Sequence, residues 1–216
     1  MKSGSKKILQ IAFSLVELLV VMALLAILLG LGVSQMSGAN SSIELSISAS
    51  EVADLFHQAR QEALMRTRDV QVRIYEVTDP DFPDLKGFRK IAIGITELGE
   101  DATDPTPVPF KKIDRDYHLP VALRFLESNK YSTLLTGQSG ATKNILAGSE
   151  EVEGVSTRYV AVLFSPNNRA RLSTDFDWTL TLVNSDQAGD SDDKLPRNFI
   201  ALQLLPGTGK VNFIQP

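Results

Sequence analysis

The most prominent pattern in the sequence is an apolar stretch close to its N-terminus. Of the 21 residues 13–33, 17 are apolar, and the exceptions are two glycines, one serine and Glu17. As an α-helix this stretch would be about 30 Å long, which matches the hydrocarbon thickness of a bilayer. The residues before it include three lysines and no acid, and a cationic leader of this kind stays on the cytoplasmic side. The pattern predicts a membrane-inserted helix.

A second helical pattern follows the apolar stretch. One stripe of helical spacing contains Val52, Leu55, Phe56, Ala59 and Ala63, as expected for a helix that packs on a sheet. Several glycines precede it, and each costs a helix up to about 1 kcal/mol relative to alanine. Capping-box spacings begin at Ser41 and at Ser48. We therefore expect the helix to restart near one of these two serines.

After Arg68 the apolar period changes from 3.6 to 2, which indicates strands. The strand candidates are 70–74, 91–95, 109–113, 121–126, 158–165, 176–183, 199–205 and 210–214. The last two flank a Pro-Gly-Thr-Gly turn signal and predict a hairpin. The segments 79–85, 99–107, 128–153 and 184–196 are predicted to be loops. The fold class is therefore α+β, with a long N-terminal helix, first transmembrane and then amphipathic, packed on an antiparallel β-rich C-terminal domain.

Three interpretations of the N-terminal segment compete. A cleaved secretory signal has a shorter apolar run with a small residue after it, whereas here Ala12 precedes the run. A plain single-pass anchor leaves Glu17 unexplained, since a carboxylate costs about 2.5–3.5 kcal/mol at the centre of a membrane helix and less near the interface. In the third interpretation the chain is cut between Ala12 and Phe13. The new α-ammonium of Phe13 then needs a partner, which a neighbouring subunit's Glu17 can supply.

The third interpretation is supported by a resemblance. The segment Ala12-Phe13-Ser14-Leu15-Val16-Glu17-Leu18-Leu19-Val20-Val21 resembles the prepilin-type cleavage and methylation signature of type IV pilins and type II secretion pseudopilins. The resemblance implies a leader, 1–12, that a membrane-embedded prepilin peptidase removes before it methylates Phe13. A transmembrane and assembly helix, 13–36, an amphipathic extension, 37–68, and a β-rich globular domain, 69–216, would follow. The family has Gly before the cut, where this chain has Ala12.

Two narrower resemblances cover more of the chain. Residues 55–63 with 70–72 resemble the helix-to-first-strand segment of the general secretion pathway H (FimT-like) minor pseudopilins. Short motifs resemble cassette protein D of the Verru_Chthon type, and they lie at 88–93, 109–112, 117–120, 132–135, 195–203 and 208–211. The role of that family is poorly defined. The resemblance therefore implies a pilin-like role and nothing finer.

Composition and charge exclude several other classes of protein. The chain has no Cys, and its 22 basic residues stand against 26 acidic ones. These counts exclude a disulfide-stapled mini-protein, a Cys-based zinc module and a strongly basic nucleic-acid binder. An arginine run, Arg60, Arg66, Arg68 and Arg73, is interspersed with acidic residues and is interpreted as a solvated helix end. Nucleic acid is not expected as a partner.

No group of residues predicts catalysis or cofactor binding. His57 and His118 lack the neighbouring residues that nucleophile or metal chemistry needs. Ser165 and Ser173 lack a Gly-x-Ser-x-Gly elbow, and the sequence at 206–210 lacks the spacing of a phosphate loop. We therefore expect a protein that is not an enzyme and that holds no cofactor.

An acidic loop is the one weak candidate for a metal site. It contains Asp186, Asp190, Asp192 and Asp193, and calcium prefers such hard oxygen ligands. The loop lacks the glycine and the glutamate of an EF-hand at the required offsets. A solvated acidic loop is therefore the favoured interpretation.

The sequence predicts a structural pilin-like subunit, a minor pseudopilin. Prepilin peptidase would process it, and it would assemble with other pilin-like subunits into a type IV pilus or a type II secretion-like filament. The expected location is the inner membrane, with a single span and a periplasmic globular domain. Secretion and DNA uptake both remain open as the role of the filament. The alternative is a single-pass, membrane-anchored extracytoplasmic binding protein that does not assemble.

Overall fold

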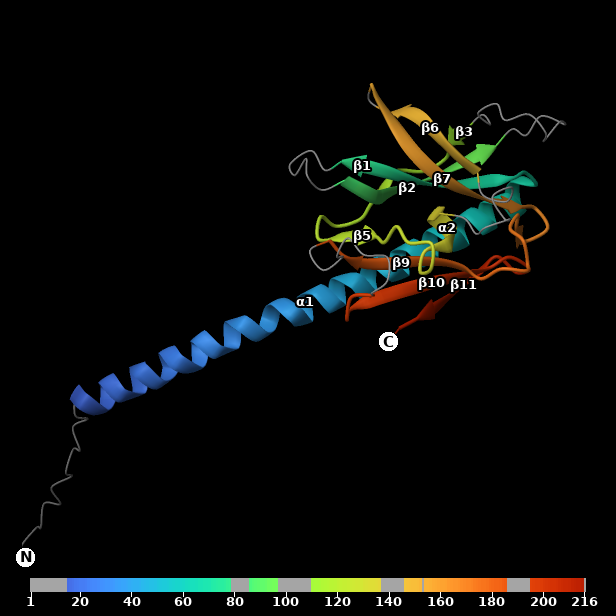
Figure 1. Cartoon of the computed structure of the whole chain (residues 1–216). Helices are drawn as coiled ribbons and strands as arrows, with labels where there is room; N and C mark the ends of the chain where they lie inside the picture. The colour runs from blue at the N-terminus through green and yellow to red at the C-terminus, as the bar shows by residue number, and fades with distance from the viewer. Residues whose placement is uncertain are drawn as a thin grey trace, which may run out of the picture. The chain divides into compact units, whose positions relative to one another are not determined.

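The chain divides into two compact units, Met1–Asn40 and Ser41–Pro216. The computed structural model describes residues 15–78, 86–96, 110–136, 146–152, 154–185 and 195–215, and for residues 28–40 and 96 it describes the backbone alone. Helix α1, Leu15–Arg66, contributes residues to both units, and every other described element belongs to the second unit (Figure 1).

The backbone of α1 is helical without interruption across its 52 residues. The expected restart near Ser41 or Ser48 is therefore wrong. Both serines lie inside the helix, and Ser48 is buried. A helix that continues keeps every i→i−4 hydrogen bond, and this outweighs the modest cost of its glycines. The helix ends at Arg66, where Thr67 takes a positive φ of 53°.

The strands of the second unit are all joined by antiparallel pairing. The elements after α1 are β1 (Val70–Thr78), β2 (Lys86–Thr96), β3 (Phe110–Lys112), β4 (Tyr117–His118), β5 (Leu123–Phe125), α2 (Thr133–Thr136), β6 (Leu146–Val152), β7 (Val155–Ser165), β8 (Arg169–Ala170), β9 (Trp178–Asn184), β10 (Phe199–Leu205) and β11 (Lys210–Ile214). Within the described residues they form one sheet in the order β11-β10-β9-β5-β2-β1-β7-β6, with β3 and β4 paired to β2 and β8 paired to β7. The predicted α+β class with an antiparallel sheet is confirmed.

The strand predictions differ in outcome along the chain. The hairpin of β10 and β11 is confirmed, with Leu205 paired to Lys210 and a positive φ of 60° at Gly209. The interpretation of 128–153 as one loop is wrong, because this segment contains both α2 and β6. Half-buried and exposed residues alternate along β6, but the half-buried set includes a glycine and a glutamate, so the alternation does not show as a hydrophobic pattern. Its pairing with β7 holds it in place, and such pairing leaves little trace in a local hydrophobic pattern.

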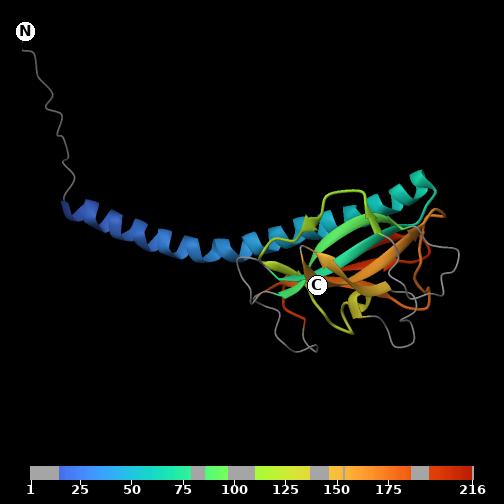
Figure 2. The same ribbon diagram turned by 90° about the horizontal axis from the view of Figure 1, so that it is seen from above.

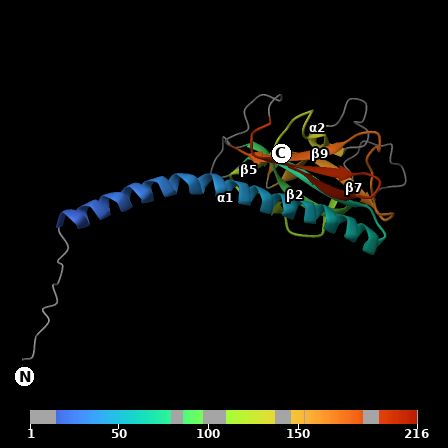
Figure 3. The same ribbon diagram turned by 90° about the horizontal axis from the view of Figure 1, so that it is seen from below.

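The core of the second unit lies between α1 and one face of the sheet. Leu45, Val52 and Phe56 of α1 pack with Val72 of β1 and Trp178 of β9 in one buried cluster. Figures 2 and 3 show this part of α1 along one face and α2 on the other side of the sheet. The predicted stripe of α1 is confirmed, except that Leu55 is only partly buried. Burial of each large side chain contributes about 1.5–3 kcal/mol.

The sheet consists of two half-sheets joined by one short strand. β5 has three residues, pairs with β9 at each of them, and pairs with β2 only through Phe125 and Phe88. Beyond β5, the edge of β9 is satisfied by hydroxyl groups instead of a strand. The backbone N–H groups of Thr179 and Thr181 donate to Thr133 Oγ1 at 2.9 Å and Ser132 Oγ at 3.0 Å. The segment leading into α2 thus caps the half-sheet β9-β10-β11.

Candidate assembly surface

The N-terminal unit presents an apolar helix surface. All thirteen side chains from Leu15 to Ile27 are exposed. The ten large apolar side chains are 48–82% exposed: Leu15, Val16, Leu18, Leu19, Val20, Val21, Met22, Leu24, Leu25 and Ile27. A helix that is apolar on all sides is buried in its working environment. A segment with this much exposed apolar surface is of the kind that lipid or packed helices cover.

Glu17 is the one charged residue among these thirteen. It lies in the first turn of α1, where a carboxylate interacts favourably with the helix dipole. Its side chain is exposed, and none of the described residues forms an ion pair with it. When an apolar surface of this kind is covered, a carboxylate within it needs a cation as its partner.

Several predictions about the N-terminus fall on residues that the structure does not describe. The leader 1–12, the cleavage point between Ala12 and Phe13, and the methylation of Phe13 all lie outside the described residues. Among the described residues, no helix has an apolar stretch that is long enough for a membrane span. The transmembrane segment 13–36 and the boundary at 68 stay predictions.

A polar strap fastens α1 to the sheet in the second unit. The strap is the segment 113–117, which follows β3, ends with the first residue of β4 and passes over the outer side of α1 (Figure 2). Tyr117 donates its hydroxyl proton to Glu51 at 2.6 Å, and Gln58 Nε2 donates to Asp114 at 2.7 Å. Asp116 turns to the sheet and pairs with Lys90 at 2.9 Å and Lys112 at 2.7 Å. The strap thus links α1 to the sheet by hydrogen bonds, while its end residues Ile113 and Tyr117 pack against the core.

The carboxyl group of Asp116 links the stability of the strap to pH. Burial alone raises its pKa, but hydrogen bonds from Lys112 and Lys90 outweigh burial, and the pKa lies below the ordinary value. A lowered pKa in the folded state stabilises the fold above the unfolded pKa, and this contribution disappears as the pH falls through the folded pKa.

We therefore expect the wild type to lose more unfolding free energy than Asp116→Asn on acidification. The measurement is the urea midpoint of both chains between about pH 6 and pH 3, the range in which a carboxylate titrates. The other carboxylates are common to both chains, so their effects cancel in the difference. An equal loss in the two chains would contradict the assignment.

The face of the sheet away from α1 buries an arginine. Arg73 is 3% exposed, and its guanidinium lies 4.1 Å from the ring centroids of both Phe110 and Tyr159. It donates to Glu150, which also accepts a hydrogen bond from Tyr75 at 2.8 Å. Burial and then the bond to Glu150 raise the pKa of the Tyr75 hydroxyl, which stays protonated. The interpretation of Arg73 as part of a solvated helix end is therefore wrong: it is a stacked and paired residue of β1.

The remaining sequence-derived candidates lie apart from one another. His57 is half-buried on α1, His118 is exposed on β4, and Ser173 is half-buried in the segment before β9. Ser165 accepts a hydrogen bond from Arg171 Nε at 2.9 Å. The part of the chain that the structure describes contains no group of three metal-ligating side chains. The weak calcium candidates Asp186, Asp190, Asp192 and Asp193 lie outside the described residues.

Comparisons with known proteins give one similar fold. No protein-family model matches the chain, and no curated protein matches it. Among solved structures, the chain is similar to the minor pseudopilin EpsH from the Type 2 Secretion System of Vibrio cholerae. The sequence identity is 14% and the TM-score is 0.40, and the match covers 80% of this chain and 98% of that chain.

Proposed function

We propose that the protein is a structural, pilin-like subunit of the minor pseudopilin type. Prepilin peptidase cuts it between Ala12 and Phe13, and it assembles with other pilin-like subunits into a type II secretion-like filament or a type IV pilus. The observation that carries the proposal is the fully exposed apolar segment Leu15–Ile27, with Glu17 as its one charge. The resemblance of residues 12–21 to the prepilin-type signature, which overlaps this segment, supports the same conclusion.

In this proposal the exposed segment anchors the subunit in the membrane before assembly and contacts other subunits after it. Each large apolar side chain costs about 1.5–3 kcal/mol when it is left in water. Before assembly, the ten exposed side chains of this segment are therefore not expected to stay in water. In the proposed cycle residues 13–36 wait in the inner membrane. They then exchange lipid contacts for contacts with neighbouring helices, and the globular domain stays on the periplasmic side. The lysines of the leader favour this orientation.

In the assembled state Glu17 pairs with the α-ammonium group of Phe13 on a neighbouring subunit. Both charges leave water at this contact, and a charge in an apolar environment is tolerated only when it is paired. The pairing also fixes the axial register between subunits, because the two groups meet at only one offset. No chemical reaction is assigned to the protein after its processing.

Mass spectrometry of the mature N-terminus tests the proposal. The expected chain begins with N-methylated Phe13 when it is produced together with a prepilin peptidase. The variant Ala12→Leu is the control, because the signature places a small residue before the cut and a bulky one should block processing. A wild-type chain that still begins at Met1 would overturn the proposal. That result would favour the single-pass anchored binding protein.

A further inference from the structure

The second unit concentrates arginine at one place. Although the chain carries a net charge of −4, arginines gather at the C-terminal end of α1 and at β8. They are Arg60, Arg66, Arg68, Arg169 and Arg171. Arg60 donates to Asn168, Arg66 pairs with Glu62 at 2.5 Å, and Arg171 pairs with Asp69 at 2.6 Å. These contacts bring α1, β8 and the start of β1 together at this site.

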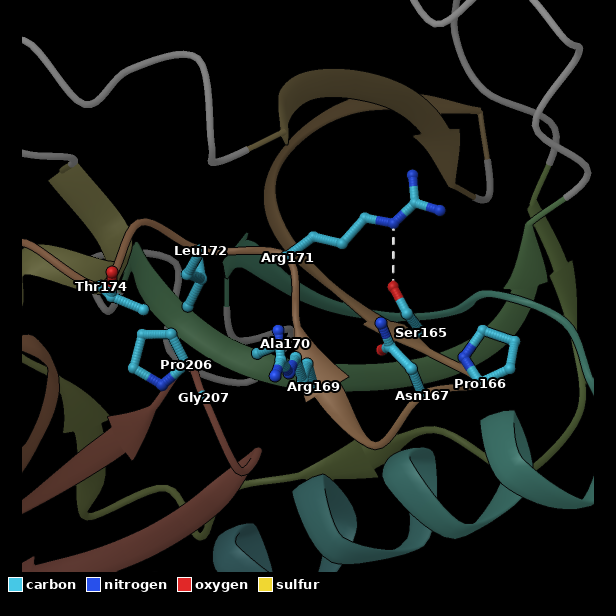
Figure 4. A pocket seen from close by; sticks show the side chains of 10 residues that line it. All are labelled: Ser165, Pro166, Asn167, Arg169, Ala170, Arg171, Leu172, Thr174, Pro206 and Gly207. Atoms are coloured by element: carbon cyan, nitrogen blue, oxygen red, sulfur yellow. Dashed lines mark hydrogen bonds between the residues drawn. The ribbon is translucent and has the colours of Figure 1, made fainter.

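We propose that the cleft beside β8 binds an acidic, extended segment of a partner protein. The cleft has a volume of about 540 Å³, within the range of ligand sites. Figure 4 shows Thr174 and Pro206 on one side, Ser165 and Asn167 on the other, and Arg169 between them. The site lies wholly in the second unit, and the proposal does not depend on Glu17 or on filament assembly.

Arg169 is the residue that recognises the ligand. It is exposed, and its guanidinium makes no hydrogen bond or ion pair with any residue that the structure describes. A guanidinium binds a carboxylate through two parallel hydrogen bonds. Arg171 is held in place by Ser165 and Asp69, yet its side chain is 49% exposed. Because Asp69 balances the charge of Arg171, Arg169 is the lining cation that is left to pair with a ligand.

The remaining lining residues favour a peptide over a nucleic acid. Among the described residues no aromatic side chain lines the cleft, so these residues offer bases no ring on which to stack. Pro166 and Pro206 are half-buried and give the cleft apolar surface that the side chains of a peptide can contact. A Cβ added at Gly207 would have no atom within 4 Å, so an approaching main chain meets open space there.

Fluorescence anisotropy on the full chain in detergent tests the proposal. The probe is a labelled octapeptide of alternating Glu and Val, and its comparison is the same peptide with Gln in place of Glu. We expect the Glu peptide to bind and the Gln peptide to bind at least tenfold more weakly. Arg169→Gln should weaken binding of the Glu peptide at least tenfold.

Arg197→Gln is the matched control, because Arg197 is also exposed. Arg197 is also far from the cleft. Its neighbour Asn198 bonds to Ser42, whereas Arg60 marks the end of α1 that lies near β8. Ser42 and Arg60 are about 27 Å apart along α1 at 1.5 Å per residue. This control should bind the Glu peptide as the wild type does. The urea midpoint of Arg169→Gln should be unchanged, which shows that the fold is intact.

Three outcomes would overturn the proposal. The first is that neither peptide binds or both bind equally, and the second is that Arg169→Gln changes nothing. The third is that a single-stranded oligonucleotide binds more tightly than the Glu peptide and loses this binding in Arg169→Gln. A failure of N-terminal processing leaves this test unaffected, so the two proposals fail separately.

Discussion

A chain carrying Glu17→Gln is expected to be cleaved and inserted like the wild type and to be absent from filaments. Glutamine keeps the size of the side chain and removes its charge. The α-ammonium of the neighbouring Phe13 would then enter an apolar contact without a counter-charge. Breaking a buried ion pair on one side costs about 3–5 kcal/mol, which lowers the association constant more than a hundredfold.

Incorporation of Glu17→Gln is measured by quantifying the subunit in sheared, purified filaments against its amount in the membrane fraction. Glu44→Gln is the matched control, since it removes another carboxylate from the same helix in the second unit. We expect normal incorporation of Glu44→Gln and loss of Glu17→Gln at equal membrane levels. Wild-type incorporation of Glu17→Gln would rule out the proposed pairing.

The substitution Phe56→Ala is expected to lower the free energy of unfolding by about 3–5 kcal/mol. Phe56 is 2% exposed, and its ring meets Phe164 of β7 edge to face at 6.1 Å between centroids. Its removal leaves a cavity between α1 and the sheet, and the edge-to-face contact is lost as well. The effect is a large part of the stability of a domain of this size.

Urea unfolding followed by tryptophan fluorescence measures this loss. The chain has one tryptophan, Trp178, which is fully buried and donates its indole N–H to the Ser173 carbonyl at 2.8 Å. Met65→Ala is the control on the same helix, because Met65 is 71% exposed and should change stability by less than about 0.5 kcal/mol. Similar midpoints for the two variants would show that α1 does not stabilise the sheet through Phe56.

The parts of the fold that the sequence predicts are those with a strong local pattern. The stripe that includes Val52 and Phe56 repeats at helical spacing, and the β10–β11 hairpin carries both alternation and a turn signal. Glu17 can be recognised from the sequence for the same reason, since it is a single charged residue within a long apolar stretch. Each of these signals depends on residues that are close together in the chain.

The features that the sequence does not reveal depend on residues far apart in the chain. Glu51 and Tyr117 of the strap are separated by 66 positions, and Arg73 and Glu150 by 77. Such pairs leave no periodicity in either segment. An arginine in a strand usually indicates a solvent-exposed face. The sequence therefore gives no sign that Arg73 is buried between two aromatic rings.

The short strand β5 has a mechanical consequence. The buried cluster that contains the core residues of α1 also contains residues of both half-sheets, such as Val72 of β1 and Leu202 of β10. If tension is applied along α1, the load divides between the two halves, and β5 with its neighbouring hydroxyl contacts is the seam where they would shear apart. Within the sheet, only the three residues of β5 join the two half-sheets. Packing of both half-sheets with α1 is therefore what mainly holds them together.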